Sequence, residues 1–228
     1  MNPSLQPAPA ASRAPYRSVL FDLDGTLVDS APDLAAAVNR MRRERGLDEL
    51  ALQRLRPMAS HGARGLLQEG LGAGPQDPDW KSLRDEFLRN YESAICVHTR
   101  LFDGVAQLLE ELQRRGIAWG IVTNKLERYT SALLRELDFG VPPGCVVSGD
   151  TTPRAKPAPD PLLHAAAELG IDPASCLYLG DDLRDVQAAL AAGMDAGAAA
   201  YGYGGADAAR LWGAHHVLDS PGELLALL

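Results

Sequence analysis

The chain has 228 residues, enough for one large domain or for one domain with a modest insertion. Apolar residues make up 46% of it and charged residues 23%, the balance of a soluble globular protein with a sizeable core. The formal net charge of -8 argues against a nucleic-acid or anionic-membrane partner, because both are bound by clusters of Lys and Arg, but it is compatible with a small anionic substrate held by local donors and a metal.

The first fifteen residues are rich in Pro, Ala and Ser and lack the apolar stretch of a secretory signal, so a disordered tail is expected over 1–15. No apolar run reaches the roughly 18 residues that a membrane span needs. The cysteines, Cys96, Cys145 and Cys176, form no C-x-x-C pair and have no zinc-site spacing, which fits small buried side chains in a reducing compartment. A cytoplasmic location is therefore expected.

Short apolar runs alternate with helical stretches along the rest of the chain, which favours an α/β fold with a parallel sheet. The first strand is expected at 18–21, and the helix after it has Ser30 as its N-cap and Pro32 in its first turn. Only helical patterns and loops follow over 30–98, so this segment is expected to be a helical insertion. The apolar stripe of its first helix is Leu34, Ala37, Val38 and Met41. Further strands are expected at 117–123, 146–148, 177–179 and near 217, and further helices at 105–112, 126–137, from 160, at 186–190 and at 221–227.

Polar side chains gather just past the carboxyl ends of three predicted strands. In an open α/β sheet, ligands bind in the crevice outside these ends. The sequence therefore predicts a single site assembled from remote segments. Its members are Asp22, Asp24, Thr123, Asn124, Asp181 and Asp182.

Carboxylates dominate this predicted site. Asp22 and Asp24 leave the strand on the same side, and their repulsion is costly unless a cation lies between them. With Asp181 they offer the oxygen ligands that suit Mg²⁺, and a carboxylate can also act as a nucleophile toward phosphorus. Lys156 offers a point charge to a phosphate, and Gly25 lets the backbone approach it closely. Taken singly, the D-x-D-G segment at 22–25 could be a turn, and Asp181 with Asp182 could be a helix N-cap pair. Together, these segments are much more specific for a phosphate site than any one of them.

Four segments resemble the four motifs of the haloacid dehalogenase-like hydrolases, in the family's order and with similar spacing. They are FDLDGTL at 21–27, VTN at 122–124, KP at 156–157 and GDDLRD at 180–185. The resemblance extends from about Tyr16 to the end of the chain. It implies a Rossmann-like doubly wound parallel sheet core over 16–29 and 99–228, with a small all-helical cap over 30–98 inserted after the first strand.

The resemblance also implies a role for each motif residue. Asp22 would be the nucleophile and a Mg²⁺ ligand, and Asp181 would be the second side-chain ligand. Asp24 would be the general acid/base and would also give its backbone carbonyl to the metal. The phosphate would be held by Gly25, Thr123, Asn124 and Lys156, with Lys156 also counted as catalytic; Asp182 and Asp185 would lie nearby.

Asp24 distinguishes two reactions of the family. The dehalogenases lack this second acidic residue, because displacement of an alkyl halide needs no acid for the leaving group. Cleavage of a phosphate ester does need one, and Asp24 can supply the proton. The sequence therefore predicts a Mg²⁺-dependent phosphatase that acts on a small-molecule phosphate ester through an aspartyl-phosphate on Asp22.

The helical cap is expected to exclude water and to select the substrate. Within it, the Gly-rich segment SHGARG at 60–65 carries Arg64, which is predicted to reach the site and contact the anionic or polar end of the substrate. The alternative is a solvated Arg on the cap surface. His61 is expected to be exposed, Arg184 to form a structural ion pair with Asp182 or Asp185, and no function is assigned to His215 and His216.

Three segments resemble N-acetylmuramic acid 6-phosphate phosphatases more than phosphoglycolate phosphatases. They are VHTRLFDG at 97–104, GDDLRD at 180–185 and YGYG at 201–204. The segment FDLDGTLVDS at 21–30 fits both. The expected substrate is N-acetylmuramic acid 6-phosphate, used in peptidoglycan recycling, or 2-phosphoglycolate. Both carry a carboxylate besides the phosphate, so Arg64 could serve either. A phosphosugar mutase with the same motifs and a non-catalytic metabolite-binding protein stay open as alternatives.

Overall fold

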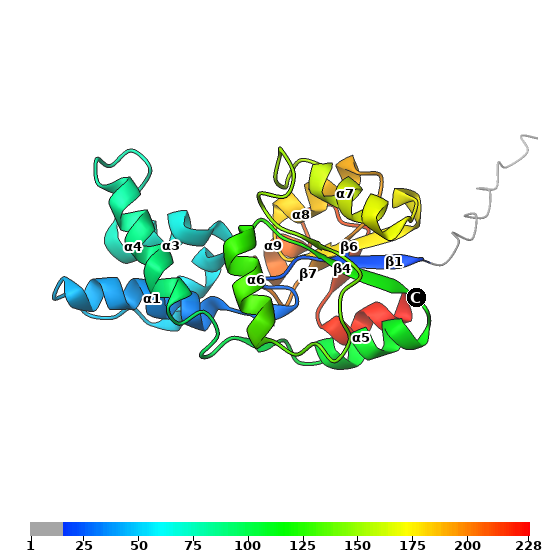
Figure 1. Ribbon diagram of the computed structural model, residues 1–228, viewed down its shortest axis with the longest axis horizontal. Helices are drawn as coiled ribbons and strands as arrows, with labels where there is room; N and C mark the ends of the chain where they lie inside the picture. Colours follow the sequence, from blue (N-terminus) through cyan, green and yellow to red (C-terminus); the bar gives the residue numbers. More distant parts are fainter. Residues whose placement is uncertain (1–15) are drawn as a thin grey trace, which may run out of the picture.

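The computed structural model describes residues 16–228, so the disordered tail predicted over 1–15 lies outside the described residues. Figure 1 shows two parts side by side, a layered α/β core and a helical cap. The cap lies beyond the end of the core at which strand β1 (Ser18–Phe21) stops. Any site at the carboxyl end of the sheet therefore faces the cap.

Six parallel strands form the sheet of the core, and β1 lies in its middle. Ser18 of β1 pairs with Ala118 on one side and with Cys176 on the other, so β1 is flanked by β4 and β6. The order of the strands therefore reverses at β1. At such a reversal point, the crevice that binds ligands lies outside the carboxyl ends of the strands. In spatial order the strands are β5 (Val146–Val147), β4 (Ala118–Val122), β1, β6 (Cys176–Gly180), β7 (Asp195–Ala199) and β8 (His216–Leu218).

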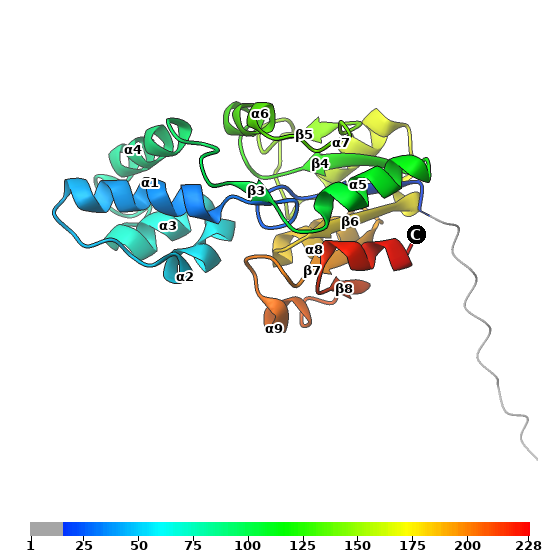
Figure 2. The ribbon, with the colours of Figure 1, turned by 90° about the horizontal axis from the view of Figure 1, so that it is seen from below.

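Alternate side chains of β1 enter two separate apolar clusters, because neighbouring residues of a strand point to opposite faces. Val19 and Phe21 belong to one cluster and Leu20 to the other, and all three are fully buried. Helices on both faces bury this continuous apolar run, as is typical of a parallel sheet. α5 (Val105–Arg114) and the 3-10 helix η3 (Pro221–Ala226) cover one face, and α7 (Asp160–Leu169) and α8 (Leu183–Ala191) cover the other (Figures 1 and 2). The remaining helices of the core are α6 (Glu127–Glu136), η2 (Pro173–Ser175) and α9 (Ala206–Ala209).

The cap is a helical insertion between two short antiparallel strands, β2 (Val28–Asp29) and β3 (Arg100–Leu101). Leu34, Ala37, Val38 and Met41 are buried, and the helix that carries them packs against the four other helices of the cap. The predicted apolar stripe and the helical insertion after the first strand are thus confirmed. The helices of the cap are α1 (Ala31–Glu44), α2 (Leu52–Leu55), η1 (Arg56–His61), α3 (Gly62–Leu71) and α4 (Trp80–Glu92).

Three local predictions differ from the structure. The buried strand β7 was not predicted, because its sequence, DAGAA, contains no β-branched or aromatic residue. Helix α7 begins at Asp160 with Pro159 as its N-cap, one residue before the predicted cap. The predicted C-terminal helix is a 3-10 helix that ends at Ala226.

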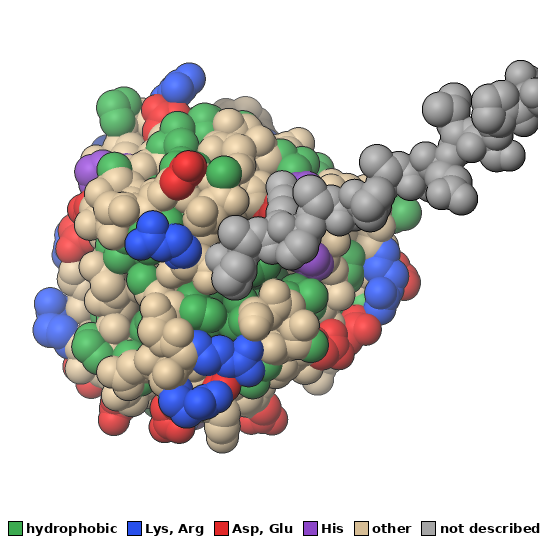
Figure 3. Space-filling view, turned by 90° about the vertical axis from the view of Figure 1, so that its right-hand side faces the viewer, with side chains coloured by type: hydrophobic (Ala, Val, Ile, Leu, Met, Phe, Trp, Pro, Cys, Tyr) green, Lys and Arg blue, Asp and Glu red, His purple; other side chains and the backbone are tan. Residues whose placement is uncertain are grey.

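Charged side chains of both signs are interspersed over the end of the molecule away from the cap (Figure 3). The hydrophobic side chains visible on this face lie between polar ones and do not gather into one patch. Within residues 16–228, no helix combines the length and the apolar character that crossing a bilayer would require.

Candidate active site

The predicted site residues meet around one cavity of about 330 Å³ between the core and the cap. Asp22 and Asp24 follow β1, Thr123 and Asn124 follow β4, and Asp181 follows β6, so three neighbouring strands deliver them to one edge of the sheet. The cavity is lined by Asp22, Asp24, Arg64, Thr123, Asn124, Lys156, Asp181 and Asp182 of the predicted set, together with Asp185.

Three carboxylates, from Asp22, Asp181 and Asp185, each place an oxygen within 4.8 Å of the others. Asp181 and Asp185 are buried, and so is the Oδ1 atom of Asp22, which faces the Lys156 ammonium. Within residues 16–228, the Lys156 ammonium is the one that forms ion pairs with this cluster. When all three carboxylates are ionised, their three negative charges exceed the one positive charge by two, and the cluster offers only oxygen atoms to a metal. The cluster therefore fits a hard divalent cation such as Mg²⁺.

The Lys156 ammonium binds the carboxylate cluster from the core side. Its Nζ lies 2.9 Å from Asp22 Oδ1 and 2.7 Å from Asp185 Oδ1. It also lies within hydrogen-bond distance of the Tyr178 hydroxyl, at 2.7 Å, and of the Val122 carbonyl, at 3.0 Å. Burial acts to lower the pKa of Lys156, but Asp185 and Asp22 outweigh it, so the pKa is raised and the group stays charged.

Two carboxylates of the cluster, those of Asp22 and Asp181, carry raised pKa values. Burial raises the pKa of Asp22 to about 6; Lys156 opposes this increase and Asp185 adds to it. Burial also raises the pKa of Asp181 well above its ordinary value, with repulsion from Asp22 and Asp185 acting in the same direction. A bound cation favours the charged forms and would lower both values.

The carboxylate of Asp181 is enclosed by backbone from two remote loops. A Cβ atom at Gly25, where φ is 89°, or at Gly202 would overlap the Asp181 side chain. Tyr203 donates its backbone N–H to Asp181 Oδ2 at 2.8 Å, and Thr26 donates its hydroxyl to Oδ1 at 3.3 Å. Gly25 therefore permits the close approach of Asp181, while its own N–H donates to the Val28 carbonyl. Its predicted contact with phosphate stays a prediction.

The Asp24 carboxylate does not belong to the carboxylate cluster and is held by Lys125, for which the sequence predicts no role. Lys125 Nζ lies 2.8 and 3.0 Å from the two carboxylate oxygens, and the Ser30 hydroxyl donates to Oδ1. The same ammonium lies 4.8 Å from the centre of the Tyr91 ring, which belongs to α4 of the cap. Burial acts to lower the pKa of Lys125, but Asp24 and Tyr91 raise it overall.

Asp24 was predicted to bind the metal through its backbone carbonyl, and this stays a prediction. The third side-chain carboxylate near Asp22 is that of Asp185, which the sequence analysis placed only nearby. The last motif explains this position: Asp182 is the N-cap of α8, and Asp185 accepts a hydrogen bond from its backbone N–H at 3.0 Å. This capping box directs the Asp185 side chain toward the start of the helix, where Lys156 lies.

Thr123 and Asn124 brace the loop after β4. Asn124 and Lys156 exchange two hydrogen bonds, because the Asn124 amide donates to the Lys156 carbonyl at 2.9 Å and accepts from its N–H at 3.0 Å. The buried hydroxyl of Thr123 accepts from the Lys125 N–H at 3.2 Å. Both residues line the cavity, and their contact with a phosphate stays a prediction.

On the cap side, Arg64 is exposed and lines the cavity, and His61 is exposed as expected. Arg184 forms the predicted ion pair with Asp182, with Nε 2.8 Å from Oδ1, and it also donates to the Ser60 carbonyl of the cap. His215 and His216, to which no function was assigned, lie near the strand β7 instead. There His215 Nδ1 accepts from the Ala196 N–H at 2.9 Å, and His216 Nε2 lies 3.1 Å from the Tyr16 hydroxyl.

Comparison with known proteins identifies the family. The family model of the haloacid dehalogenase-like hydrolases matches residues 19–199. The chain is 39% identical over 217 residues to an N-acetylmuramic acid 6-phosphate phosphatase of Pseudomonas aeruginosa, covering 95% of this chain and 96% of that protein. It is 43% identical over 212 residues to a phosphoglycolate phosphatase of Xanthomonas campestris pv. campestris, covering 91% and 94%. A crystal structure described as a predicted phosphoglycolate phosphatase from Haemophilus somnus superimposes with a TM-score of 0.81 at 26% identity, covering 93% and 97%. The chain therefore belongs to the haloacid dehalogenase-like hydrolase family, as a phosphatase.

Proposed function

We propose that this phosphatase depends on Mg²⁺ and hydrolyses a small carboxylated phosphate ester through an aspartyl-phosphate on Asp22. The observation that carries the proposal is the buried cluster of three carboxylates with one ammonium, which leaves two negative charges for a divalent cation to balance. The candidate substrates are N-acetylmuramic acid 6-phosphate and 2-phosphoglycolate. Relatives with each of these activities in their names are about equally similar to this chain.

Asp22 is the nucleophile of the proposed reaction. Its side chain lines the cavity and is 13% exposed, so a substrate phosphorus can reach it while most of the carboxylate stays fixed. A carboxylate oxygen forms a bond to phosphorus as the bond from phosphorus to the ester oxygen breaks, in line. Lys156, beside Asp22, stabilises negative charge on the phosphoryl oxygens. Mg²⁺, held by Asp22, Asp181 and Asp185, would add to this neutralisation of charge when bound.

Asp24 handles the protons. In the first step its carboxylic acid gives a proton to the leaving ester oxygen, and in the second its carboxylate takes a proton from the water that attacks the aspartyl-phosphate. The products are an alcohol and inorganic phosphate, with Asp22 restored. Lys125 and Ser30 hold the Asp24 side chain beside the cavity.

The cap supplies the contact with the rest of the substrate. Arg64 is positively charged, lines the cavity and makes no side-chain hydrogen bond or ion pair within residues 16–228. A guanidinium group binds a carboxylate through two parallel hydrogen bonds, so Arg64 suits the carboxylate of either candidate substrate.

The test is phosphate release from N-acetylmuramic acid 6-phosphate and from 2-phosphoglycolate, measured side by side with Mg²⁺. Asp22→Asn should abolish release, whereas the matched control Asp103→Asn, in an exposed loop outside the cavity, should leave it unchanged. Chelation should stop the reaction and Mg²⁺ should restore it.

A kcat/KM at least about tenfold higher for one ester, about 1.4 kcal/mol of transition-state preference, would assign the substrate. Interconversion of hexose phosphates without net phosphate release would instead mark a mutase. Full activity of Asp22→Asn would refute the nucleophile.

A further inference from the structure

One face of cap helix α4 (Trp80–Glu92) lines the active-site cavity along nearly the whole helix. The lining residues are Trp80, Arg84, Phe87, Leu88 and Tyr91, at spacings that place them on the same side of an α-helix. With a rise of 1.5 Å per residue, the eleven steps from Trp80 to Tyr91 span about 16 Å. The active-site cavity is therefore an elongated groove.

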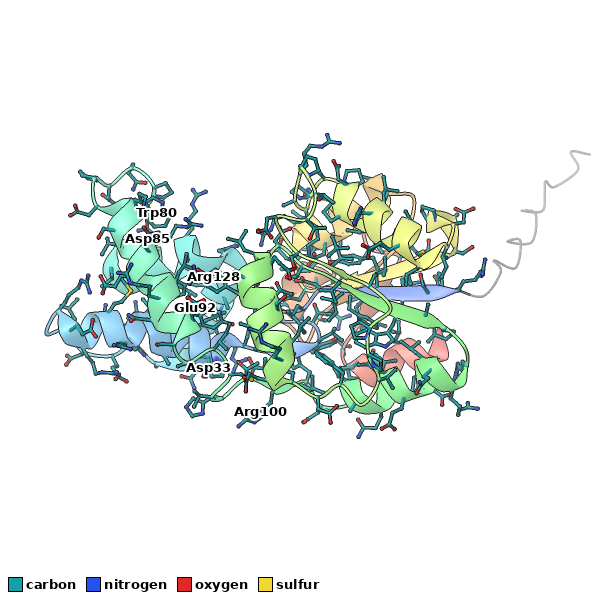
Figure 4. The ribbon with its side chains drawn as sticks, viewed as in Figure 1. Asp33, Trp80, Asp85, Glu92, Arg100 and Arg128 are labelled. Atoms are coloured by element: carbon teal, nitrogen blue, oxygen red, sulfur yellow. The ribbon has the colours of Figure 1, made fainter. Side chains whose placement is uncertain are left out.

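The inner end of this groove lies at the reacting groups. The ring of Tyr91 is 4.8 Å from Lys125 Nζ, and Lys125 binds the proposed general acid Asp24. The outer end lies at Trp80, which Figure 4 shows at the end of α4 remote from α6, whereas Glu92 lies at the end next to it. Arg84 lies seven residues before Tyr91, which is about 10 Å farther out along the helix.

This length exceeds what a two-carbon acid can use. In 2-phosphoglycolate, three bonds separate the phosphorus from the carboxylate carbon, a distance of about 4 Å. Such a molecule spans less than half of the roughly 10 Å that separate Tyr91 from Arg84 along the helix. A hexose 6-phosphate with a carboxylate on a ring substituent extends roughly 8 Å from the phosphorus, so it reaches the outer half of the groove.

The outer end has the chemistry to bind such a molecule. Arg84 is exposed and makes no side-chain hydrogen bond or ion pair within residues 16–228. Several other cap arginines are committed to partners, as Arg45 is to Glu86 at 2.7 Å. Trp80 lies one helical turn from Arg84 on the same face and offers an apolar ring surface beside a free cation.

We propose that Trp80 and Arg84 form an outer subsite that selects a ring-bearing, carboxylated phosphate ester, with the sugar ring against Trp80 and the carboxylate of this longer ester on Arg84 rather than on Arg64. This inference rests on the proposed phosphatase reaction at Asp22, and it names the substrate class of that site as sugar acid phosphates. Arg89 provides a matched control, because it is an exposed arginine of the same helix that does not line the cavity.

The test compares kcat/KM for three esters and a reporter. N-acetylmuramic acid 6-phosphate has both ring and carboxylate, N-acetylglucosamine 6-phosphate has the ring without that carboxylate, and 2-phosphoglycolate has a carboxylate without the ring. Arg84→Gln should lower kcat/KM at least about tenfold for the first ester alone. Trp80→Ala should lower it for both sugar esters, and Arg89→Gln should change none.

The reporter p-nitrophenyl phosphate separates failure of this inference from failure of the proposed function. Hydrolysis of the reporter that requires Asp22, together with equal or no effect of Arg84→Gln on all three esters, would overturn the outer subsite and leave the reaction standing. Hydrolysis of 2-phosphoglycolate in preference to both sugar esters would overturn it as well. Absence of Asp22-dependent hydrolysis of every ester, including the reporter, would overturn both. Thermal melting of each variant checks that it is folded.

Discussion

Asp33 links the beginning of the cap to its end, and its removal should destabilise the protein. The residue lies in the first turn of α1 and is 3% exposed (Figure 4). Its Oδ2 atom accepts from the backbone N–H of Thr99 at 2.8 Å and from the Thr99 hydroxyl at 2.7 Å. Both oxygens also lie 3.0 Å from the backbone N of His98. One carboxylate thus satisfies three donors on the segment that returns from the cap.

The magnitude follows from what Asp33→Ala leaves behind. Thr99 is fully buried, so its N–H and hydroxyl would lose their partner without gaining water, at a cost of about 1–3 kcal/mol each. His98 is exposed, and its N–H can be hydrated instead. We therefore expect Asp33→Ala to lower the free energy of unfolding by about 2–6 kcal/mol. Asp33→Asn should cost less, because an amide oxygen can still accept from Thr99.

Urea unfolding followed by circular dichroism measures this loss. The control is Asp85→Ala, which removes a solvent-exposed ion pair with Lys81 at 2.7 Å on α4 (Figure 4). Such a pair contributes roughly 0–1 kcal/mol, so the control should unfold close to the wild type. A loss below about 1 kcal/mol for Asp33→Ala, or one no larger than that of the control, would show that the Asp33 hydrogen bonds do not stabilise the fold as argued.

Two further predictions concern the charged groups of the site. Lys125→Met should lower kcat and lower the free energy of unfolding by about 3 kcal/mol, because it leaves the Asp24 carboxylate without its cation. In urea unfolding, the double variant Lys125→Met with Asp24→Asn should be more stable than Lys125→Met. A double variant no more stable than Lys125→Met alone would contradict this. The pKa of Asp22 is raised to about 6, against 3.8 for the ordinary group. Between these two pH values the metal-free folded protein therefore binds a proton that the unfolded chain does not. The contribution of Asp22 to stability is present at low pH and is lost as the pH rises through about 6. Mg²⁺ binds the carboxylate form of Asp22, so it should raise the melting temperature more at about pH 7.5 than at about pH 5. An equal rise at both pH values, in the wild type and in Asp22→Asn alike, would refute the assignment of Asp22 as a Mg²⁺ ligand.

The parts of this molecule that the sequence predicts well are those where a local pattern determines the structure. The apolar run of β1 must be buried on both faces, and the polar residues that follow it must then lie at the sheet edge. The stripe of α1 repeats with the period of a helix, so its buried face could be predicted. Strand β7 lacked such a signal, because Ala and Gly carry little strand preference and its burial depends on neighbours β6 and β8.

The missed site residues depend on contacts between remote segments. Lys125 follows the predicted phosphate-binding pair directly, but only the fold reveals that its ammonium meets Asp24, 101 residues earlier in the chain. Tyr203 lies in the YGYG segment at 201–204, whose sequence predicts no structural role. The fold places its N–H on Asp181 and its hydroxyl within 2.9 Å of the Ala31 N–H at the start of α1. Long-range placement of this kind leaves no periodic trace in a single sequence.

The short ribbon of β2 and β3 has a consequence beyond holding the cap. Val28 lies opposite Leu101, and Asp29 opposite Arg100, so the two points where the inserted segment meets the core are neighbours in space. A module whose ends meet can be exchanged, lengthened or shortened without moving the strands that carry Asp22 and Asp181, because the spacing across the ribbon stays the same. Replacement of the segment between these strands by that of a relative should therefore transfer substrate preference while leaving the phosphoryl chemistry in place.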